Sequence, residues 1–292
     1  MTLAVHHVAL NAVDCDAAAR LYREGAGFRA VDCKGENWLA GPNGYLLVAA
    51  TAGPIGARER NRRVCDAGIT HICIQSGSGR ALWDHLAAAG MCFNDAPVAL
   101  GTGAIYAYGA DGENNITEVE GVADADPAVP PWIAHVALAT PDIERLSAFY
   151  AALIGRPVHN HGRYANALFE NITGLKDVDI RAAWIMADNL TFEMWQYVNP
   201  PTERAEPPEA AAPGWVHVGF AADDLDAEAA RLDAAGIEVA PTRFVDLKGL
   251  AGRDPDGNRF LVVARPPADH ALSFERLTAP SFVADRNRSL LG

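Results

Sequence analysis

Four histidines and two glutamates are the residues of this chain whose types and positions could hold a metal ion. The histidines occur near the start of four short apolar segments, residues 5–10, 69–74, 133–138 and 215–220, and they are His7, His71, His135 and His217. Intervals of 64, 64 and 82 residues separate them. Four histidines in one register along a chain indicate an internal repeat in which a metal-ligand position has been copied.

In each of these segments the alternation of side chains predicts a β-strand with two different faces. The face that carries the histidine has a small residue two positions further on, such as Ala9, Ala137 and Gly219. The opposite face is large and apolar, as in a strand that a helix covers. Small neighbours leave volume in front of the imidazole, so the pattern predicts the wall of a cavity.

The two glutamates, Glu118 and Glu193, lie in otherwise apolar segments that follow an Asn-containing turn. An unpaired buried carboxylate costs several kcal/mol, and a cation is the usual compensation. If consecutive repeats pair, each half of the chain offers two histidines and one glutamate. These sets are His7, His71 and Glu118 in the first half, and His135, Glu193 and His217 in the second. Two imidazoles and one carboxylate suit a redox-active or Lewis-acid divalent ion with positions left open for a substrate.

The elements that must position these residues recur in the same order. Amphipathic helices are expected at residues 14–24, 79–89, 141–154 and 225–235, each followed by a glycine that suits a helix C-terminus. Asp16, Asp142 and Asp224 suit the helix N-termini, where a carboxylate accepts otherwise unpaired N–H groups. Short strands separated by Asn, Asp and Gly turns follow each helix. The repeated unit is therefore βαβββ, and the chain contains four.

Two Pro- and Ala-rich stretches interrupt the repeats. The first, residues 123–131, marks a domain boundary, so we expect an N-terminal module pair at 1–122 and a C-terminal pair at 132–265. The second, residues 199–213, is expected to be a long crossover inside the second domain. Residues 266–292 lie outside the repeats and form a C-terminal extension that could cap a cavity or pack on a partner.

The bulk composition limits the classes of function. The chain has 292 residues, half of them hydrophobic, and a formal net charge of −13. This charge disfavours nucleic acid and acidic membranes as partners and leaves a small-molecule substrate, with or without a homo-oligomer. Five cysteines, an odd number with no Cys-x-x-Cys pair, and no signal peptide or transmembrane run indicate reduced thiols and a cytoplasmic protein.

With these features the chain resembles the vicinal oxygen chelate superfamily, which includes glyoxalase I, methylmalonyl-CoA epimerase, bleomycin- and fosfomycin-resistance proteins and the type I extradiol dioxygenases. The resemblance extends over residues 5–263 and is strongest at 135–138, 190–197 and 252–262. It implies an α+β fold in which four βαβββ modules pair into two domains with cupped mixed sheets. It also implies that metal ligands come from the first and last strands of each module, at the six positions named above.

The resemblance suggests three functions, which we rank in order. Four modules with two histidines and one glutamate are similar to the extradiol dioxygenases. That similarity implies Fe(II) or Mn(II), a catecholic or related small aromatic substrate, and Tyr106 as the residue that hydrogen-bonds it. Residues 97–100 stand where those enzymes carry a proton-handling histidine. The second half is similar to the glyoxalase and epimerase branch, which implies a lyase or isomerase with Ni(II), Co(II), Mn(II) or Zn(II). The third alternative is a non-catalytic small-molecule binding protein of the resistance type.

Overall fold

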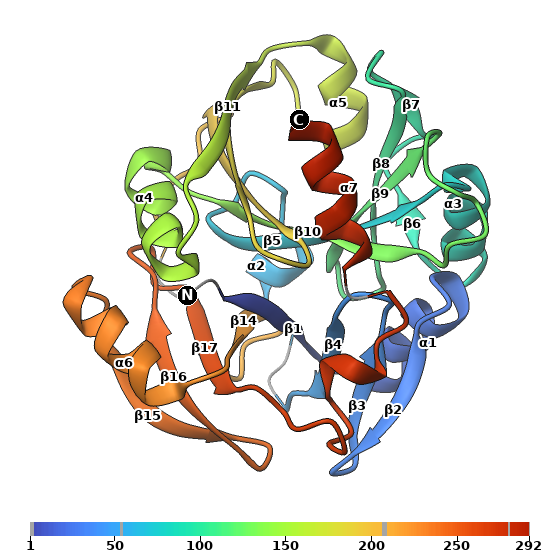
Figure 1. The fold of residues 1–292 in the computed structure, drawn as a ribbon. Helices are drawn as coiled ribbons and strands as arrows, with labels where there is room; N and C mark the ends of the chain where they lie inside the picture. The colour runs from blue at the N-terminus through green and yellow to red at the C-terminus, as the bar shows by residue number, and fades with distance from the viewer. Residues whose placement is uncertain (1–2, 53–54, 206–208, 280, 292) are drawn as a thin grey trace.

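The structure is a computed structural model that describes residues 3–52, 55–205, 209–279 and 281–291. Its four modules follow one another along the chain and build two sheets (Figure 1). The first module contains β1 (Ala4–Ala12), α1 (Cys15–Gly25), β2 (Arg29–Cys33), β3 (Glu36–Ala40) and β4 (Tyr45–Ala50). After the short α2 (Ala57–Arg60), the second contains β5 (Gly68–Ser76), α3 (Gly79–Ala88), β6 (Cys92–Phe93), β7 (Val98–Ala99), β8 (Ala104–Ala110) and β9 (Ile116–Val122).

The second half of the chain repeats this order. The third module contains β10 (Trp132–Ala139), α4 (Ile143–Ile154), β11 (Val158–Tyr164), α5 (Ala167–Thr173), β12 (Asp179–Met186) and β13 (Thr191–Asn199). The fourth contains β14 (Gly214–Ala222), α6 (Leu225–Ala234), β15 (Val239–Phe244), β16 (Leu247–Arg253) and β17 (Arg259–Ala264). A 3₁₀ turn (Phe274–Arg276) and α7 (Phe282–Leu291) form the tail.

The four module helices begin close to the predicted residues. Asp142 accepts a hydrogen bond from the Arg145 N–H at the start of α4, and Asp224 caps α6 in the same way. The cap of α1 is Asp14, and Asp16 lies in the first turn, where its charge still complements the helix dipole. Gly155 ends α4 in the left-handed conformation, with φ 76°. No helix in the described part of the chain is long and apolar enough to cross a membrane.

The predicted α+β fold with two cupped mixed sheets is confirmed, but the predicted partners are wrong. One sheet has the strand order β15-β16-β17-β14-β1-β4-β3-β2 and joins modules 1 and 4; we call it sheet 1/4. The other, sheet 2/3, has the order β11-β12-β13-β10-β5-β9-β8-β6, with β7 on β8. The predicted domains 1–122 and 132–265 are therefore repeats in the sequence and are not separate sheets. Each sheet contains one module from each of these two segments.

Antiparallel pairing of first strands creates both seams. In sheet 1/4, β1 pairs with β14, and in sheet 2/3, β5 pairs with β10. At each seam the two strands are joined by hydrogen bonds between backbone N–H and C=O groups. All four first strands have these groups. The side-chain patterns of the four first strands therefore do not state which of these strands pair with each other.

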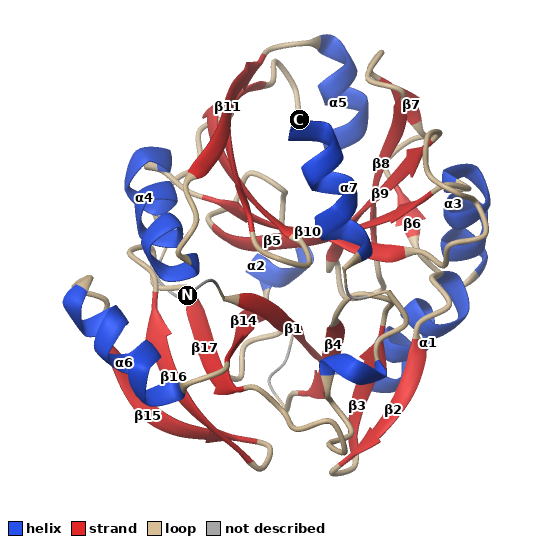
Figure 2. Ribbon diagram, viewed as in Figure 1, coloured by secondary structure: helices blue, strands red, loops and turns tan. Residues whose placement is uncertain are grey.

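The apolar faces of the two sheets and the helices share one core. It includes Val8, Ile72, Val136 and Val218, which lie on the strand faces opposite the four histidines, as predicted. Figure 2 shows the helices in two groups, α1 beside α3 and α4 beside α6, along the region between the sheets. The histidine faces of the sheets therefore point away from this common core.

The C-terminal extension packs on its own chain. Leu272, Phe274 and Leu277 join Trp38 and Tyr45 in a cluster on the histidine face of sheet 1/4, and the Tyr45 hydroxyl donates to the Ser273 carbonyl at 2.6 Å. The following helix α7, red in Figure 1, crosses over β5 and β10 of sheet 2/3. Its Phe282 ring lies 4.8 Å from the Trp132 ring. The tail therefore fills the cup of one sheet and borders that of the other.

Candidate metal centre

Two histidines and two glutamates from four strands meet on the concave face of sheet 2/3. They are His71 on β5, Glu118 on β9, His135 on β10 and Glu193 on β13, all buried. One ligand atom from each lies within 4.8 Å of the others. Glu118 pairs with Cys73, two residues after His71, and Glu193 pairs with Ala137, two residues after His135. Each module thus contributes a histidine from its first strand and a glutamate from its last.

His71 is held in the tautomer that a metal ligand needs. The Thr70 hydroxyl oxygen lies 2.9 Å from Nδ1 of His71 and 3.3 Å from the Ala137 carbonyl oxygen. Because a carbonyl only accepts, the hydroxyl donates to it and accepts from Nδ1–H. Nε2 then carries a lone pair directed at Glu118, whose Oε2 is 3.2 Å away. Two lone pairs at this distance call for a cation between them, either a proton, which makes a hydrogen bond, or a metal ion.

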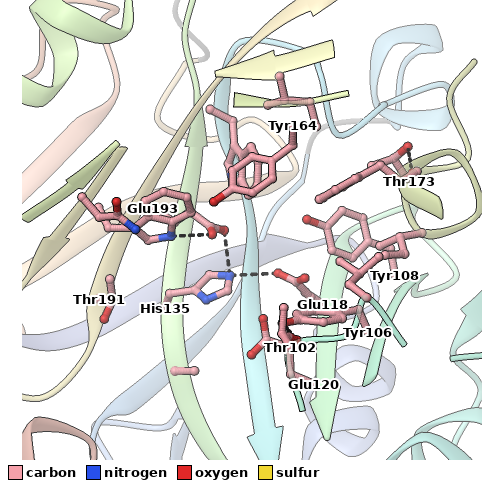
Figure 3. A pocket seen from close by; sticks show the side chains of 18 of the residues that line it. Thr102, Tyr106, Tyr108, Glu118, Glu120, His135, Tyr164, Thr173, Thr191 and Glu193 are labelled. Carbon is pink, nitrogen blue, oxygen red and sulfur yellow. Dashed lines mark hydrogen bonds and ion pairs between the residues drawn. The ribbon is translucent and has the colours of Figure 1, made fainter. Parts of the chain in front are cut away.

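Glu193 supplies the second indication of a cation. Figure 3 shows His135 between Glu118 and Glu193. Nε2 of His135 lies 2.9 Å from Oε2 of Glu118 and 3.0 Å from Oε2 of Glu193, but one N–H cannot donate well to both. Oε2 of Glu193 is buried without a hydrogen bond, while its Oε1 accepts from the Trp184 indole N–H at 2.8 Å. A buried bare carboxylate oxygen is costly unless a cation satisfies it.

The charges of the cluster are strongly coupled. Burial alone raises the pKa of Glu118, but its hydrogen bonds with His135 and His71 lower that pKa to about 2. Burial alone lowers the pKa of His135, but the Glu193 carboxylate and the neighbouring Cys73 and Glu118 raise it well above its usual value. The donor set of two imidazole nitrogens and two carboxylates, with one oxygen unsatisfied, fits a divalent first-row metal ion.

A cavity of about 470 Å³ opens above this cluster. Seven aromatic residues contribute to its walls, and they are Tyr106, Tyr108, Tyr164, Phe169, Trp184, Trp195 and Tyr197. The predicted catalytic residue Tyr106 lines it, and the Tyr106 hydroxyl lies 2.8 Å from the Thr102 hydroxyl. Burial raises the pKa of Tyr106 to about 12, so the phenol keeps its proton at neutral pH.

The structure does not bring His7 and His217 into this cluster, which corrects the predicted ligand sets. His7 was expected beside His71 and Glu118, and His217 beside His135 and Glu193. Both instead lie at the seam of sheet 1/4, where their Nε2 atoms are 2.9 Å apart. The positions that carry the glutamates in sheet 2/3 hold Leu47 and Leu261 here, opposite Ala9 and Gly219.

The histidines of sheet 1/4 form a chain of neutral imidazoles. The Leu272 carbonyl accepts from Nε2–H of His6, so Nδ1 of His6 accepts from Nδ1–H of His7, and Nε2 of His7 accepts from Nε2–H of His217. Each of these contacts is 2.9 Å long. The Phe244 ring stacks on His7 at 4.6 Å. Aromatic packing and the tail therefore occupy the place that the metal cluster has in sheet 2/3.

Glu120 and Trp184 line the cavity, have hydrogen-bond partners there, and were not among the residues that the sequence singled out. Glu120 lies two positions after Glu118 on β9, lines the cavity, and accepts a hydrogen bond from Gln75. Burial and the charge of Glu118 raise the pKa of Glu120 to about 8. The alternation of a strand places Glu118 and Glu120 on one face and could have revealed it. Trp184 has no comparable pattern, because its partner Glu193 belongs to the neighbouring strand.

The chain belongs to the Glyoxalase/Bleomycin resistance protein/Dioxygenase superfamily, whose family model matches residues 4–123 and 132–262. Each match covers two of the four modules. The chain is similar in fold to glyoxalase I from Zea mays, with a TM-score of 0.67, 18% identity, and coverage of 90% of this chain and 92% of that one. It is also similar to a candidate dioxygenase from Bacillus subtilis, with a TM-score of 0.65, 13% identity, and coverage of 99% and 95%. No curated protein sequence matches the chain.

Proposed function

We propose that the protein is a metal-dependent lyase or isomerase that moves a proton on a carbon next to a carbonyl group. The observation that supports this proposal is the meeting of His71, Glu118, His135 and Glu193 at one place. A divalent ion held there would act as a Lewis acid on the carbonyl oxygen and stabilise the negative charge that develops when the proton leaves.

The number of protein ligands favours this function over the dioxygenase that the sequence placed first. That hypothesis rested on sets of two histidines and one glutamate, which leave three positions of an octahedral ion open for a chelating diol and O₂. Here the fold assembles two histidines and two glutamates. Four protein ligands would leave a divalent ion fewer open positions than three do, which favours one chelating substrate over a diol together with O₂.

The cavity provides a carboxyl group for the proton. Glu120 lies outside the four-residue cluster, yet its carboxylate is within 4.8 Å of ligand atoms of Glu118 and His135. Gln75 donates a hydrogen bond to it and fixes its orientation. In the proposed reaction the ionised form of Glu120 accepts the proton from the carbon that carries the hydroxyl group and returns it to the former carbonyl carbon, while the hydroxyl proton passes to the other oxygen. The pKa of about 8 makes this carboxylate a stronger base than an ordinary one. Tyr106 hydrogen-bonds the substrate, and the aromatic walls exclude water.

Metal content tests the proposed site. We expect about one divalent ion per chain of protein purified without added metal, retained after removal of weakly bound ions. His71→Ala and Glu193→Ala should lose this ion. His217→Gln is the matched control, because His217 has the same position in its module but lies in sheet 1/4. Loss of metal in His217→Gln with retention in His71→Ala would contradict the proposed site.

Hydrogen exchange tests the proposed reaction. The metal-loaded protein is incubated in D₂O under nitrogen with hydroxyacetone or 2-hydroxyacetophenone, and NMR follows deuterium uptake at the carbon that carries the hydroxyl group. Exchange with either compound, lost in Glu120→Gln with metal content unchanged, supports the proposal. In a separate aerobic assay, oxygen consumption with catechol, together with no exchange under nitrogen, would favour the dioxygenase. Metal binding with neither reaction would favour a binding protein.

A further inference from the structure

Resting on the proposed function, we infer that the substrate is a compact, uncharged molecule with an aromatic group and a hydrogen-bond acceptor that faces Trp195. The inference concerns the cavity above the metal cluster, whose lining differs from that of a site for an anionic ligand. The charge of this lining, its shape and its unpaired polar atoms each support one part of the inference.

The first part is charge. Of the described residues that line the cavity, none is a lysine or an arginine, whereas three are glutamates: Glu118, Glu120 and Glu193. The one histidine of the lining outside the cluster is His159, and burial lowers its pKa, which favours the neutral imidazole. Away from the metal ion, a carboxylate or phosphate on the substrate would lose its hydration with no lysine or arginine of the described lining to compensate it. The cavity therefore selects against anionic groups.

Two arginines of a neighbouring cavity have partners of their own. Arg62 and Arg63 line a separate cavity of about 220 Å³ that shares Tyr108 and Thr173 with the first. Arg62 donates to Asn115 and to the Pro213 carbonyl, and Arg63 pairs with Asp66. An anionic tail of a substrate would have to compete with these contacts on the far side of Tyr108.

The second part is shape. A volume of about 470 Å³ is near the lower end of the range for small-molecule sites. The Trp184 and Trp195 rings lie 6.0 Å apart at an interplanar angle of 75°, and the Tyr164 ring is 6.1 Å from each of them. Three rings at these angles present one face and several edges to a flat ligand. Aromatic rings attract each other in such face-to-edge arrangements. A single aromatic ring therefore fits better than a flexible chain.

The third part is an unpaired donor. The indole N–H of Trp195 is buried without a hydrogen-bond partner, although Trp195 lines the cavity. Nδ1 of His159, which also lines it, has none either. A buried donor left unpaired is costly, so a substrate whose uncharged acceptor reaches this N–H would gain that hydrogen bond on binding. Discrimination against compounds that lack the acceptor follows from the same cost.

Three probes separate the parts of the inference. 2-Hydroxyacetophenone is uncharged and aromatic, hydroxyacetone has a methyl group in place of the ring, and 4-(hydroxyacetyl)benzoate adds one carboxylate to the ring of the same hydroxyketone. Calorimetry measures their binding to the metal-loaded protein. We expect 2-hydroxyacetophenone to bind at least about tenfold more tightly than either of the other two, because each loses one complementary feature.

Two tryptophan variants test the donor. Trp195→Phe keeps an aromatic ring but removes the N–H, and we expect about fivefold weaker binding of 2-hydroxyacetophenone with unchanged metal content. Trp83→Phe is the matched control, because Trp83 also has a buried indole N–H without a partner but does not line the cavity. Binding should be unchanged in Trp83→Phe.

Each contrary result overturns a defined part. If 4-(hydroxyacetyl)benzoate bound as tightly as 2-hydroxyacetophenone, the inference that the substrate is uncharged would be wrong. Equal binding of hydroxyacetone would contradict the inferred aromatic group. Unchanged affinity in Trp195→Phe would contradict the inferred hydrogen bond between the substrate and Trp195. If no probe bound, the whole inference would be wrong. Metal content and deuterium exchange test the proposed function separately from these binding measurements. The proposed function and the inferred substrate can therefore be contradicted independently of each other.

Discussion

Asn43 and Asn189 each donate a hydrogen bond from Nδ2 to the backbone carbonyl of the other, at 2.8 and 2.7 Å. Each also holds the first strand of another module. Asn43 bonds the N–H and C=O of Ile133 on β10, and Asn189 bonds the N–H and C=O of Val5 on β1. The two side chains therefore join sheet 1/4 to sheet 2/3 in a reciprocal way, through fully buried or nearly buried amides.

This relationship predicts a coupled loss of stability. Asn43→Ala and Asn189→Ala each leave several buried backbone groups without partners, so we expect each to lower the free energy of unfolding by about 2–4 kcal/mol. Because both residues belong to one network, their double variant should lose less than the sum. Urea unfolding measures these values, and the exposed Asn171→Ala serves as a control within about 0.5 kcal/mol of wild type. Strict additivity would show that the two amides act independently.

Thr70 should influence the metal through His71. Thr70→Val keeps the shape of the side chain but removes the oxygen that accepts from Nδ1–H, so His71 loses the contact that fixes its tautomer. We expect metal affinity to fall by about 10–100-fold, measured by competition with a chromogenic chelator. Thr117→Val, which instead removes a contact with the Tyr22 hydroxyl, is the control and should leave affinity unchanged. Equal affinity of Thr70→Val and wild type would mean that Thr70 does not orient the ligand.

Gly219 makes room for the His7 ring in sheet 1/4. A Cβ at this position would lie 2.0 Å from Cε1 of His7, so Gly219→Ala must displace the ring. We expect the free energy of unfolding to fall by about 1–3 kcal/mol, with metal content unchanged because the metal centre belongs to sheet 2/3. Gly112→Ala, where a Cβ meets nothing within 4 Å, should be close to neutral. A lower metal content in Gly219→Ala would instead show that the packing of sheet 1/4 affects the metal centre in sheet 2/3.

The neutral imidazoles of sheet 1/4 predict a loss of stability in acid. Burial lowers the pKa of His6 to about 4 and that of His217 to about 3. In the unfolded chain these groups take up a proton near pH 6.5, so their contribution is fully present above that pH and is lost as the pH falls towards 4. For His6 the loss amounts to roughly 3 kcal/mol at pH 4.

Urea unfolding of the metal-free protein at pH 7.0 and at lower pH measures this dependence. His6→Gln should show a smaller decrease between the two conditions than wild type, because glutamine does not titrate. His85→Gln is the control, since His85 is exposed on α3 and its replacement should leave the pH dependence as it was. The explanation fails if His6→Gln and wild type lose the same free energy on acidification.

Much of the fold could be predicted from the sequence because it depends on local patterns. Alternation placed His71 and His135 on one strand face and the large apolar residues on the other, which became the common core. Aspartates and glycines marked the ends of the module helices, as Asp142 and Gly155 do for α4. The two glutamates were also identifiable, because a carboxylate in an apolar strand needs compensation wherever that strand lies.

The identity of the module pairs was decided only by the tertiary structure. Backbone hydrogen bonds join β1 to β14 and β5 to β10, and such groups are the same in every residue except proline. The sequence did hold one indication: Glu118 and Glu193 belong to modules 2 and 3, so only that pair gives a symmetric set. The residue types of the candidate centre were thus set by the sequence itself. Their assembly into one four-ligand cluster, with Leu47 and Leu261 left in the other sheet, depended on which strand edges met.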